Sequence, residues 1–175
     1  QGAEAAAREH EGVKAIAWTT TPWTLPTNAA LAVGPDISYA VVAEGPRGGA
    51  DVAAGAERSA DRGSRYLIAA DLLGNYAAEL GYEDAASAAE GVTETIIGRD
   101  LAGIRYERLF DYYADETEYS VASSWQFLIC DYVTTTDGTG IVHQAPAYGE
   151  EDQKLCEAAG IPVIISLDDG GRFTS

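Results

Sequence analysis

Short runs of β-forming residues recur along this chain, separated by turn residues such as Gly, Pro and Asp. Runs of this kind are typical of strands. Many short strands with few helices between them favour a β-rich α+β domain over a doubly wound parallel sheet, in which a helix follows each strand. We expect strands at residues 14–18, 29–33, 38–44, 66–69, 92–97, 125–130, 140–143 and 162–167.

Helix signals are fewer. Residues 71–80 predict a helix capped by Asp71, residues 150–159 predict a second helix, and a glycine that would end the helix follows each segment. Residues 45–63 have no periodicity and predict a flexible loop between paired strands, and residues 81–91 predict another loop. The expected architecture is a β-barrel-like core with a few peripheral helices.

Length and composition predict one domain. A chain of 175 residues that is 46% hydrophobic is long enough for one well-buried core and short for two, so we expect residues 1–175 to form a single domain. No apolar run approaches a transmembrane length, and residues 1–10 lack the apolar stretch of a signal peptide. Because the chain contains no Met, we expect a domain cut from a larger protein.

The net charge of −17 argues against extensive contact with a nucleic-acid backbone. Most nucleic-acid binders neutralise phosphates with clustered Lys and Arg. This chain has only eleven such residues, and only Arg99, Arg105 and Arg108 lie close together. Any nucleic acid must therefore be held at one end, or mostly by another part of the larger protein.

Common metal, cofactor and hydrolase motifs are missing. Cys130 and Cys156 stand outside any Cys/His ligand spacing, which predicts no metal site and no disulfide framework and fits a reducing, cytoplasmic setting. Residues 138–140 begin like a dinucleotide fingerprint, but His143 occupies the third glycine position. There is also no phosphate-binding G-x-x-x-x-G-K-[ST] loop and no G-x-S-x-G elbow. We expect no cofactor, and a hydrolase on this chain would have to activate water directly.

Residues 18–28 are dense in hydroxyl, ring and turn residues. Three successive threonines leave the strand pattern and enter a turn fixed by two prolines, where hydroxyls can hold a water, a sugar hydroxyl or a carbonyl. Residue types alone leave alternatives open, since the threonines also suit strands and turn caps, the tryptophans suit a core, and the asparagine suits a turn. The candidate residues are Trp18, Thr19, Thr20, Thr21, Trp23 and Asn28.

Residues 138–152 form a second dense segment. His143 ends an apolar strand, and Asp152 falls on the first turn of the helix expected at 150–159, so the two side chains could converge on one ligand. A carboxylate there would suit an α-ammonium group, because a desolvated charge pair is strong and directional. The alternatives are a helix-capping acid for Asp152 and a satisfied, half-buried imidazole for His143.

Residues 18–28 and 138–152 together closely resemble the editing domain, also called connective peptide 1, of class I isoleucyl-tRNA synthetases. Residues 98–110 resemble the middle segment of that family, so the resemblance covers essentially the whole chain. The valyl and leucyl relatives carry Thr-x-Arg-Pro-Glu or Thr-x-Arg-Pro-Asp where this chain has Thr-Thr-Thr-Pro-Trp at residues 19–23. That departure favours the isoleucyl branch.

The resemblance implies a proofreading hydrolase. Its reaction would cleave the ester of valine wrongly attached to the isoleucine tRNA, without a metal or a covalent enzyme intermediate, and valyl-adenylate is a further possible substrate. The partners would be the aminoacylated 3′ end of the tRNA and the remainder of the synthetase, with no membrane and with a monomeric isolated domain. The chain itself would not aminoacylate, because without Met it cannot contain the Lys-Met-Ser-Lys-Ser loop.

The resemblance also implies roles for single residues. Asp152 would hold the substrate ammonium, and His143 would act as a size gate that passes valine and blocks isoleucine, with general base as the competing assignment. The threonines and the asparagine would place the terminal adenosine and the hydrolytic water, and the tryptophans would support the walls and the tRNA end. These are Thr19, Thr20, Thr21, Asn28, Trp18 and Trp23.

Two other functions remain open at this point. A non-catalytic module that docks an aminoacyl or nucleotide end would use similar residues, and turnover of a valyl ester separates it from a hydrolase. Editing in the valyl or leucyl manner is the second, and a preference for threonyl or norvalyl esters would reveal it.

Overall fold

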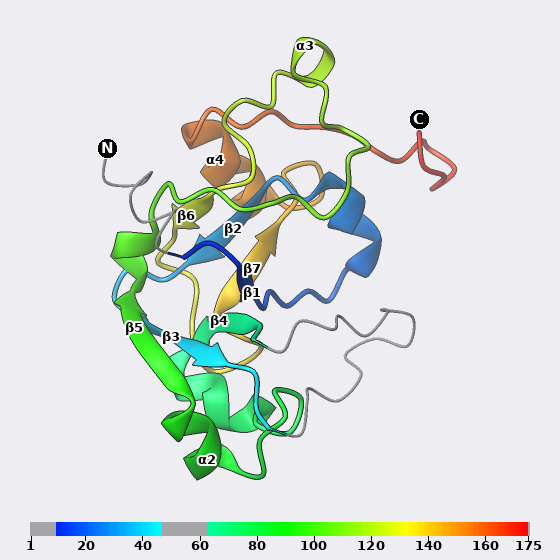
Figure 1. Ribbon diagram of the computed structural model, residues 1–175. Helices are drawn as coiled ribbons and strands as arrows, with labels where there is room; N and C mark the ends of the chain where they lie inside the picture. Colours follow the sequence, from blue (N-terminus) through cyan, green and yellow to red (C-terminus); the bar gives the residue numbers. More distant parts are fainter. Residues whose placement is uncertain (1–9, 47–62, 175) are drawn as a thin grey trace.

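The computed structural model describes residues 10–46 and 63–174, in which short strands form two mixed sheets (Figure 1). The first sheet has the strand order β1-β4-β3-β5, and the second has the order β6-β2-β7. The strands are β1 (Val13–Ala15), β2 (Ala30–Val33), β3 (Ser38–Ala43), β4 (Arg65–Ala69), β5 (Val92–Ile97), β6 (Phe127–Ile129) and β7 (Ile141–Gln144).

Each sheet combines parallel and antiparallel pairs. In the first sheet β3 pairs antiparallel with β4 and β5, and β1 pairs parallel with β4. In the second sheet β2 is central, parallel to β6 and antiparallel to β7, and its residue Leu31 lies opposite His143. Every residue of β2 is buried, which explains its continuous run of apolar residues. The pairing of β2 with β7 places the second candidate segment beside the end of the first.

Short helices cover the outer faces of the two sheets. In Figure 1, α2 lies below the first sheet and α4 lies beside the upper, second sheet. Side chains of the first sheet pack against η2 and α2 in one cluster, and Cys156 of α4 packs on Ala30 and Leu128 in another. The helices are η1 (Pro22–Thr27), η2 (Ala70–Tyr76), α2 (Ala85–Glu90), η3 (Gly98–Leu101), α3 (Glu116–Tyr119) and α4 (Glu150–Ala158).

The main core lies between the two sheets. Val41 and Leu67 of the first sheet share one buried cluster with Leu31, Phe127 and Ile141 of the second. Alternate residues of β3 point the other way, toward η2 and α2, so this strand is buried on both faces. The sequences of β2 and β3 are therefore continuous apolar runs, whereas burial alternates along the exposed part of β5.

Backbone hydrogen bonds join the sheets along one side. The Ile16 N–H donates to Leu67 O at 3.0 Å and the Trp18 N–H donates to Ile141 O at 3.2 Å, so the chain after β1 passes from one sheet to the other. The Ala69 N–H also donates to Thr139 O at 3.0 Å. The expected β-rich α+β fold is confirmed, although within the described residues the strands form two joined sheets and not one closed barrel.

The structure corrects two predictions between β4 and β5. The helix predicted at 71–80 is shorter and is the 3-10 helix η2, in which Asp71 lies in the first turn and Ala69, not Asp71, is the N-cap. The loop predicted at 81–91 contains the α-helix α2, which the Asp84 side chain caps by accepting from the Ser87 N–H at 2.8 Å. The sequence pattern missed this helix because Ser87 takes the place that Glu or Gln usually holds in a capping box.

The prediction of a strand at residues 162–167 is also wrong. Leu167 makes only an isolated bridge with Phe173, and the Ser166 N–H donates to the Tyr148 hydroxyl instead of to a strand partner. The first and sixth expected strands are shorter than predicted, while the helix predicted at 150–159 matches α4 within one residue. Most of the loop predicted at 45–63 lies outside the described residues.

Candidate functional site

The two candidate segments meet at a cavity of about 160 Å³. Trp18 forms an isolated parallel bridge with Val142, which brings the start of the first segment to the side of β7. Of the sequence-predicted residues, all but Trp23 and Asn28 line this cavity. The lining residues are Trp18, Thr19, Thr20, Thr21, Thr24, Val142, His143, Ala145, Tyr148 and Asp152.

A chain of hydroxyl groups runs along the wall formed by residues 19–24. The Thr21 N–H donates to Thr19 Oγ1 at 3.0 Å, and Thr24 Oγ1 donates to Thr21 O at 2.8 Å. The hydroxyls of Thr19 and Thr21 are 3.3 Å apart, as are those of Thr21 and Thr24. Because the Thr24 hydroxyl proton is used on Thr21 O, Thr24 Oγ1 accepts from its other neighbours. These local bonds explain why the threonines leave the strand pattern and enter η1.

Thr20 differs from its neighbours. Its side chain is exposed and lines the cavity, and its hydroxyl makes no hydrogen bond within residues 10–46 and 63–174. A hydroxyl group offers one donor and two acceptor positions. Thr20 is therefore the hydroxyl with the most capacity left for a water or a substrate oxygen.

Both ring nitrogens of His143 are hydrogen-bonded. Asn28 Nδ2 lies 2.8 Å from Nδ1, and Thr24 Oγ1 lies 2.9 Å from Nε2. Since the amide nitrogen of Asn28 can only donate and the Thr24 hydroxyl already donates to Thr21 O, Nδ1 is the unprotonated nitrogen and Nε2 carries the proton. The imidazole is thus a neutral ring in one tautomer, held on both edges.

Burial favours this neutral state. Only 7% of His143 is exposed, and desolvation lowers its pKa from 6.5 to about 4. A general base needs a free nitrogen lone pair to accept the reacting proton, and the unprotonated nitrogen of this ring, Nδ1, already accepts from Asn28. The arrangement suits a rigid wall better than a proton acceptor.

The Asp152 carboxylate lines the cavity and is anchored by one of its oxygens. It lies in the first turn of α4, and its Oδ2 accepts from the Ala145 N–H at 2.9 Å, which ties the carboxylate to the end of β7. Burial raises the pKa of this carboxyl, partly offset by that backbone hydrogen bond. A partly desolvated carboxylate gains more from a cationic partner than an exposed one does. The group is therefore suited to bind an ammonium ion in the cavity.

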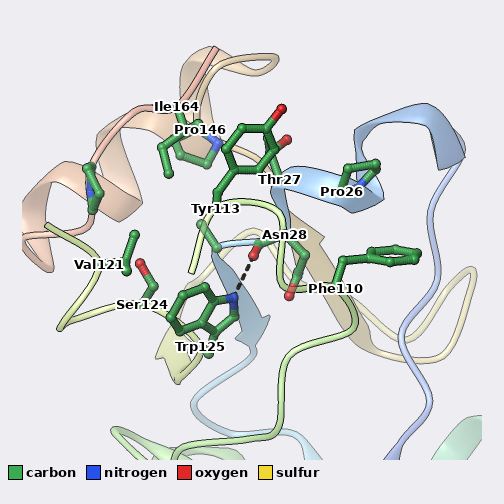
Figure 2. Close-up of a pocket in the computed structure, with 12 residues that line it drawn as sticks. Pro26, Thr27, Asn28, Phe110, Tyr113, Val121, Ser124, Trp125, Pro146 and Ile164 are labelled. Atoms are coloured by element: carbon green, nitrogen blue, oxygen red, sulfur yellow. Dashed lines mark hydrogen bonds between the residues drawn. The ribbon is translucent and has the colours of Figure 1, made fainter. Parts of the chain in front are cut away.

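Asn28 and Trp23 lie elsewhere. Asn28 is buried behind His143 and lines a separate small cavity of about 20 Å³. There its backbone carbonyl accepts from Trp125 Nε1 at 3.0 Å (Figure 2). Trp23, in η1, is 55% exposed. Asn28 can thus reach a ligand in the larger cavity only through His143, and Trp23 presents its ring to the surface.

Three residues of this site escaped the sequence analysis. Thr24 holds Nε2 of His143, and Tyr106 donates its hydroxyl proton to Asn28 Oδ1 at 2.6 Å. Tyr148 lines the cavity, and its hydroxyl is 2.7 Å from Ser166 Oγ. Thr24 lies within the first candidate segment and Tyr148 within the second, so their positions in these segments could have identified them as site residues. No local pattern in the sequence pointed to Tyr106.

The described residues show no metal centre and no spanning helix. Among them no three His, Cys, Asp or Glu side chains are grouped as metal ligands would be. No helix in this part of the chain is long and apolar enough to cross a membrane.

Sequence comparison relates the chain to one kind of protein. No family model matches it. It is 60% identical over 172 residues to the isoleucine–tRNA ligase of Leifsonia xyli subsp. xyli, a match that covers 98% of this chain and 15% of that protein. It is 47% identical to the isoleucine–tRNA ligase of Corynebacterium efficiens, covering 94% of this chain and 14% of the relative. The chain thus spans about one seventh of the length of these relatives.

Structure comparison identifies the fold. The editing domain of the P. knowlesi cytosolic leucyl-tRNA synthetase matches 95% of this chain and 64% of its own length, with a TM-score of 0.59 and 17% identity. The corresponding P. falciparum domain matches 90% of this chain and 53% of its own, with a TM-score of 0.60 and 14% identity. The chain is therefore similar to one segment of the isoleucine–tRNA ligases over nearly all of its length, and it has the fold of the leucyl-tRNA synthetase editing domains.

Proposed function

We propose that this domain hydrolyses the ester that links valine to a mischarged isoleucine tRNA. The observation that carries the proposal is that the anchored carboxylate of Asp152 lines the same cavity as the hydroxyls of residues 19–21 and the buried ring of His143. A carboxylate to hold an ammonium, hydroxyls to hold oxygen atoms and an apolar ring face are the groups that an aminoacyl ester requires. The similarity to isoleucine–tRNA ligases supports the choice of the isoleucine tRNA in this proposal.

In the proposed reaction, water attacks the carbonyl carbon of the aminoacyl ester. The bond between that carbon and the terminal ribose oxygen breaks, the water oxygen stays on the released valine, and a proton passes to the ribose oxygen. The Thr20 hydroxyl, which has no hydrogen bond among the described residues, holds the water or a ribose oxygen, and Asp152 holds the α-ammonium. Because both nitrogens of His143 are hydrogen-bonded, the rate enhancement comes mainly from the positioning of the water and the ester carbonyl.

Size selection follows from the rigidity of His143. A pocket built for isoleucine cannot strongly reject valine, since one methylene is worth only about 1–3 kcal/mol, so a second site must remove the smaller product. A ring fixed on both edges by Asn28 and Thr24 cannot move aside for the extra methylene of isoleucine. Exclusion then rests on a clash, which discriminates more strongly than weak attraction does.

The net charge of the domain limits how it can hold a tRNA. At −17 the domain repels a phosphate backbone, and the isoleucine–tRNA ligase relatives are far longer than this chain. We therefore propose that the domain binds only the aminoacylated 3′ end and that the rest of the synthetase holds the remainder of the tRNA.

The first test is binding of stable valyl and isoleucyl amide analogues of the terminal adenosine, measured by calorimetry or NMR. These analogues probe the cavity without docking of a whole tRNA. We expect the valyl analogue to bind, the isoleucyl analogue to bind much more weakly, and Asp152→Ala to lose the valyl analogue. A valyl analogue that binds Asp152→Ala as well as it binds the native domain would contradict the assigned site.

Hydrolysis of valyl-tRNA then separates an enzyme from a docking module. We expect the domain to release valine from mischarged isoleucine tRNA, and valyl-adenylate can be assayed in the same way. Binding without release of valine would identify a non-catalytic module. Faster release of threonine or norvaline than of valine would identify editing of the valyl or leucyl kind.

A further inference from the structure

Tyr106 lies outside the editing cavity and yet ends a chain of hydrogen bonds that leads into it. Its ring is partly buried against the core and packs edge-on against Phe127, with ring centroids 5.9 Å apart. Its hydroxyl donates to Asn28 Oδ1 at 2.6 Å. Burial raises the pKa of this phenol above its usual value, so it remains a donor across the physiological pH range.

Two partners together decide which way the Asn28 amide faces: Ala30 O, which can only accept, and the Tyr106 hydroxyl, which donates to Oδ1. An amide can be turned over without a change of shape, and only its partners determine where the oxygen and the nitrogen lie. With Oδ1 accepting from Tyr106, Nδ2 donates to Ala30 O at 3.0 Å and to His143 Nδ1 at 2.8 Å. The orientation of the amide in turn makes Nδ1 the acceptor and leaves the proton of His143 on Nε2, which faces Thr24.

The backbone around Asn28 is held by the same region. Trp125 adopts a positive φ of 58°, which is strained for a bulky residue. Its indole Nε1 donates to Asn28 O at 3.0 Å, its N–H donates to Ala29 O at 2.7 Å, and its carbonyl accepts from the Tyr106 N–H at 3.0 Å. Figure 2 shows the indole below Asn28, joined to it by a dashed line. Tyr106 and Trp125 therefore form one support for both the backbone and the side chain of Asn28.

We propose that Tyr106 is a positioning residue that acts through Asn28 to set the tautomer and ring orientation of His143, and so the size selection of the editing cavity. This role rests on the proposed function for its effect on selection. The tautomer itself can be measured without any substrate.

The test compares Tyr106→Phe with the native domain by ¹⁵N NMR of the imidazole nitrogens. The chain has only two histidines, so His10 serves as an internal reference for His143. In the native domain we expect His143 to show one protonated Nε2 and one unprotonated Nδ1. In Tyr106→Phe the Asn28 amide loses the partner of its oxygen, and we expect the His143 signals to shift toward a mixture of tautomers.

A matched control removes a similar hydroxyl far from this chain of contacts. Tyr82 donates to Ala43 O at 2.7 Å in the cluster beneath the first sheet. Tyr82→Phe deletes the same atom, and we expect it to leave the His143 signals and the ratio of valyl to isoleucyl hydrolysis unchanged. A shift of the tautomer in this control as large as that in Tyr106→Phe would overturn the proposal.

Kinetics give the functional half of the test. We expect Tyr106→Phe to raise kcat/KM for isoleucyl-tRNA about tenfold relative to valyl-tRNA, because a ring that can turn admits the extra methylene. An unchanged tautomer in Tyr106→Phe, or unchanged selection in spite of a changed tautomer, would overturn the proposal. If the native domain cleaves no valyl ester at all, the proposed function fails, while the NMR result still decides whether Tyr106 positions His143.

A second variant keeps the test valid should Tyr106→Phe not fold. Asn28→Asp has nearly the same shape and still accepts from Tyr106, but a carboxylate cannot donate to His143 Nδ1. We expect the proton of His143 to move to Nδ1 in this variant. A His143 ring that keeps its proton on Nε2 would show that Asn28 does not set the tautomer.

Discussion

Asn28 Nδ2 lies 2.8 Å from His143 Nδ1, although the two residues are 115 positions apart in the chain. The contact crosses from the end of η1 to β7, and on its far edge the ring meets Thr24. The imidazole is therefore buried, neutral and held at both nitrogens. This relationship links the first candidate segment to the second and explains why His143 is suited to select by size.

Shrinking His143 is expected to open the size gate. His143→Ala removes the ring that borders the cavity, and we expect isoleucyl-tRNA to become a substrate, with hydrolysis rising about 10-fold to 200-fold from the native level. Rates of deacylation of valyl-tRNA and isoleucyl-tRNA provide the measurement. Continued rejection of isoleucyl-tRNA by a folded His143→Ala domain would remove the gate role.

The stability of the domain is expected to fall on mild acidification because of His143. Its pKa is 6.5 when unfolded and about 4 when folded, so between these values the unfolded chain binds more protons. Above pH 6.5 the titration of His143 does not change the free energy of unfolding. As the pH falls to 4, it lowers the free energy of unfolding by up to about 3 kcal/mol. Asp152 in the same cavity acts in the opposite direction, because its pKa is raised on folding. Urea unfolding at several pH values measures the free energy of unfolding, and the His143→Ala variant, which lacks the imidazole, is the control.

The same lowered pKa predicts the pH profile of hydrolysis. If His143 acted as a general base with the ordinary pKa of an imidazole, 6.5, the rate would titrate near neutrality, and that dependence would vanish in His143→Ala. We expect instead that the dependence on pH between 5 and 8 is the same in the native domain and in the variant. NMR titration of His143 should place its midpoint near 4.

Neutralising Asp152 is expected to separate binding from stability. In Asp152→Asn the new amide oxygen can still accept from the Ala145 N–H, so the tie between α4 and the end of β7 is kept. The variant also removes a partly desolvated charge, and we expect its midpoint of thermal unfolding at pH 7 to equal or exceed the native value. Binding of the valyl analogue should be lost. A stable variant that binds the analogue normally would exclude the ammonium role.

Thr20 and Thr24 are expected to respond in opposite ways to removal of the hydroxyl. Thr20→Val deletes a hydroxyl without a partner in the described residues, so we expect less than about 0.5 kcal/mol of destabilisation together with a large loss of deacylation. Thr24→Val leaves the Nε2 proton of His143 without its partner, while Thr21 O keeps the Thr24 N–H, and the unpaired buried N–H costs about 1–3 kcal/mol. Unfolding curves and valyl-tRNA assays on both variants test the contrast.

Local patterns predicted most strands because β-forming residues alternate with turn residues over short distances. The predictions were wrong where neighbours outside the segment decide the outcome. Residues 162–167 are rich in β-branched residues, yet among the described residues they find no strand to pair with, and Tyr148 takes the Ser166 N–H instead. The helix α2 was missed because a Ser in its capping box replaced the usual acid.

The sequence by itself determined the fold class, the resemblance to isoleucyl-tRNA synthetase editing domains and most of the predicted residues that line the cavity, because strand periodicity and the two dense segments are local properties of the chain. It could not determine which atoms meet. The pairing of β2 with β7 and the bridge between Trp18 and Val142 close the cavity, and the Tyr106–Asn28–His143 contacts choose the tautomer. These are contacts between segments far apart in the chain, and hydrogen bonds depend on distances of tenths of an ångström that only the packed core imposes.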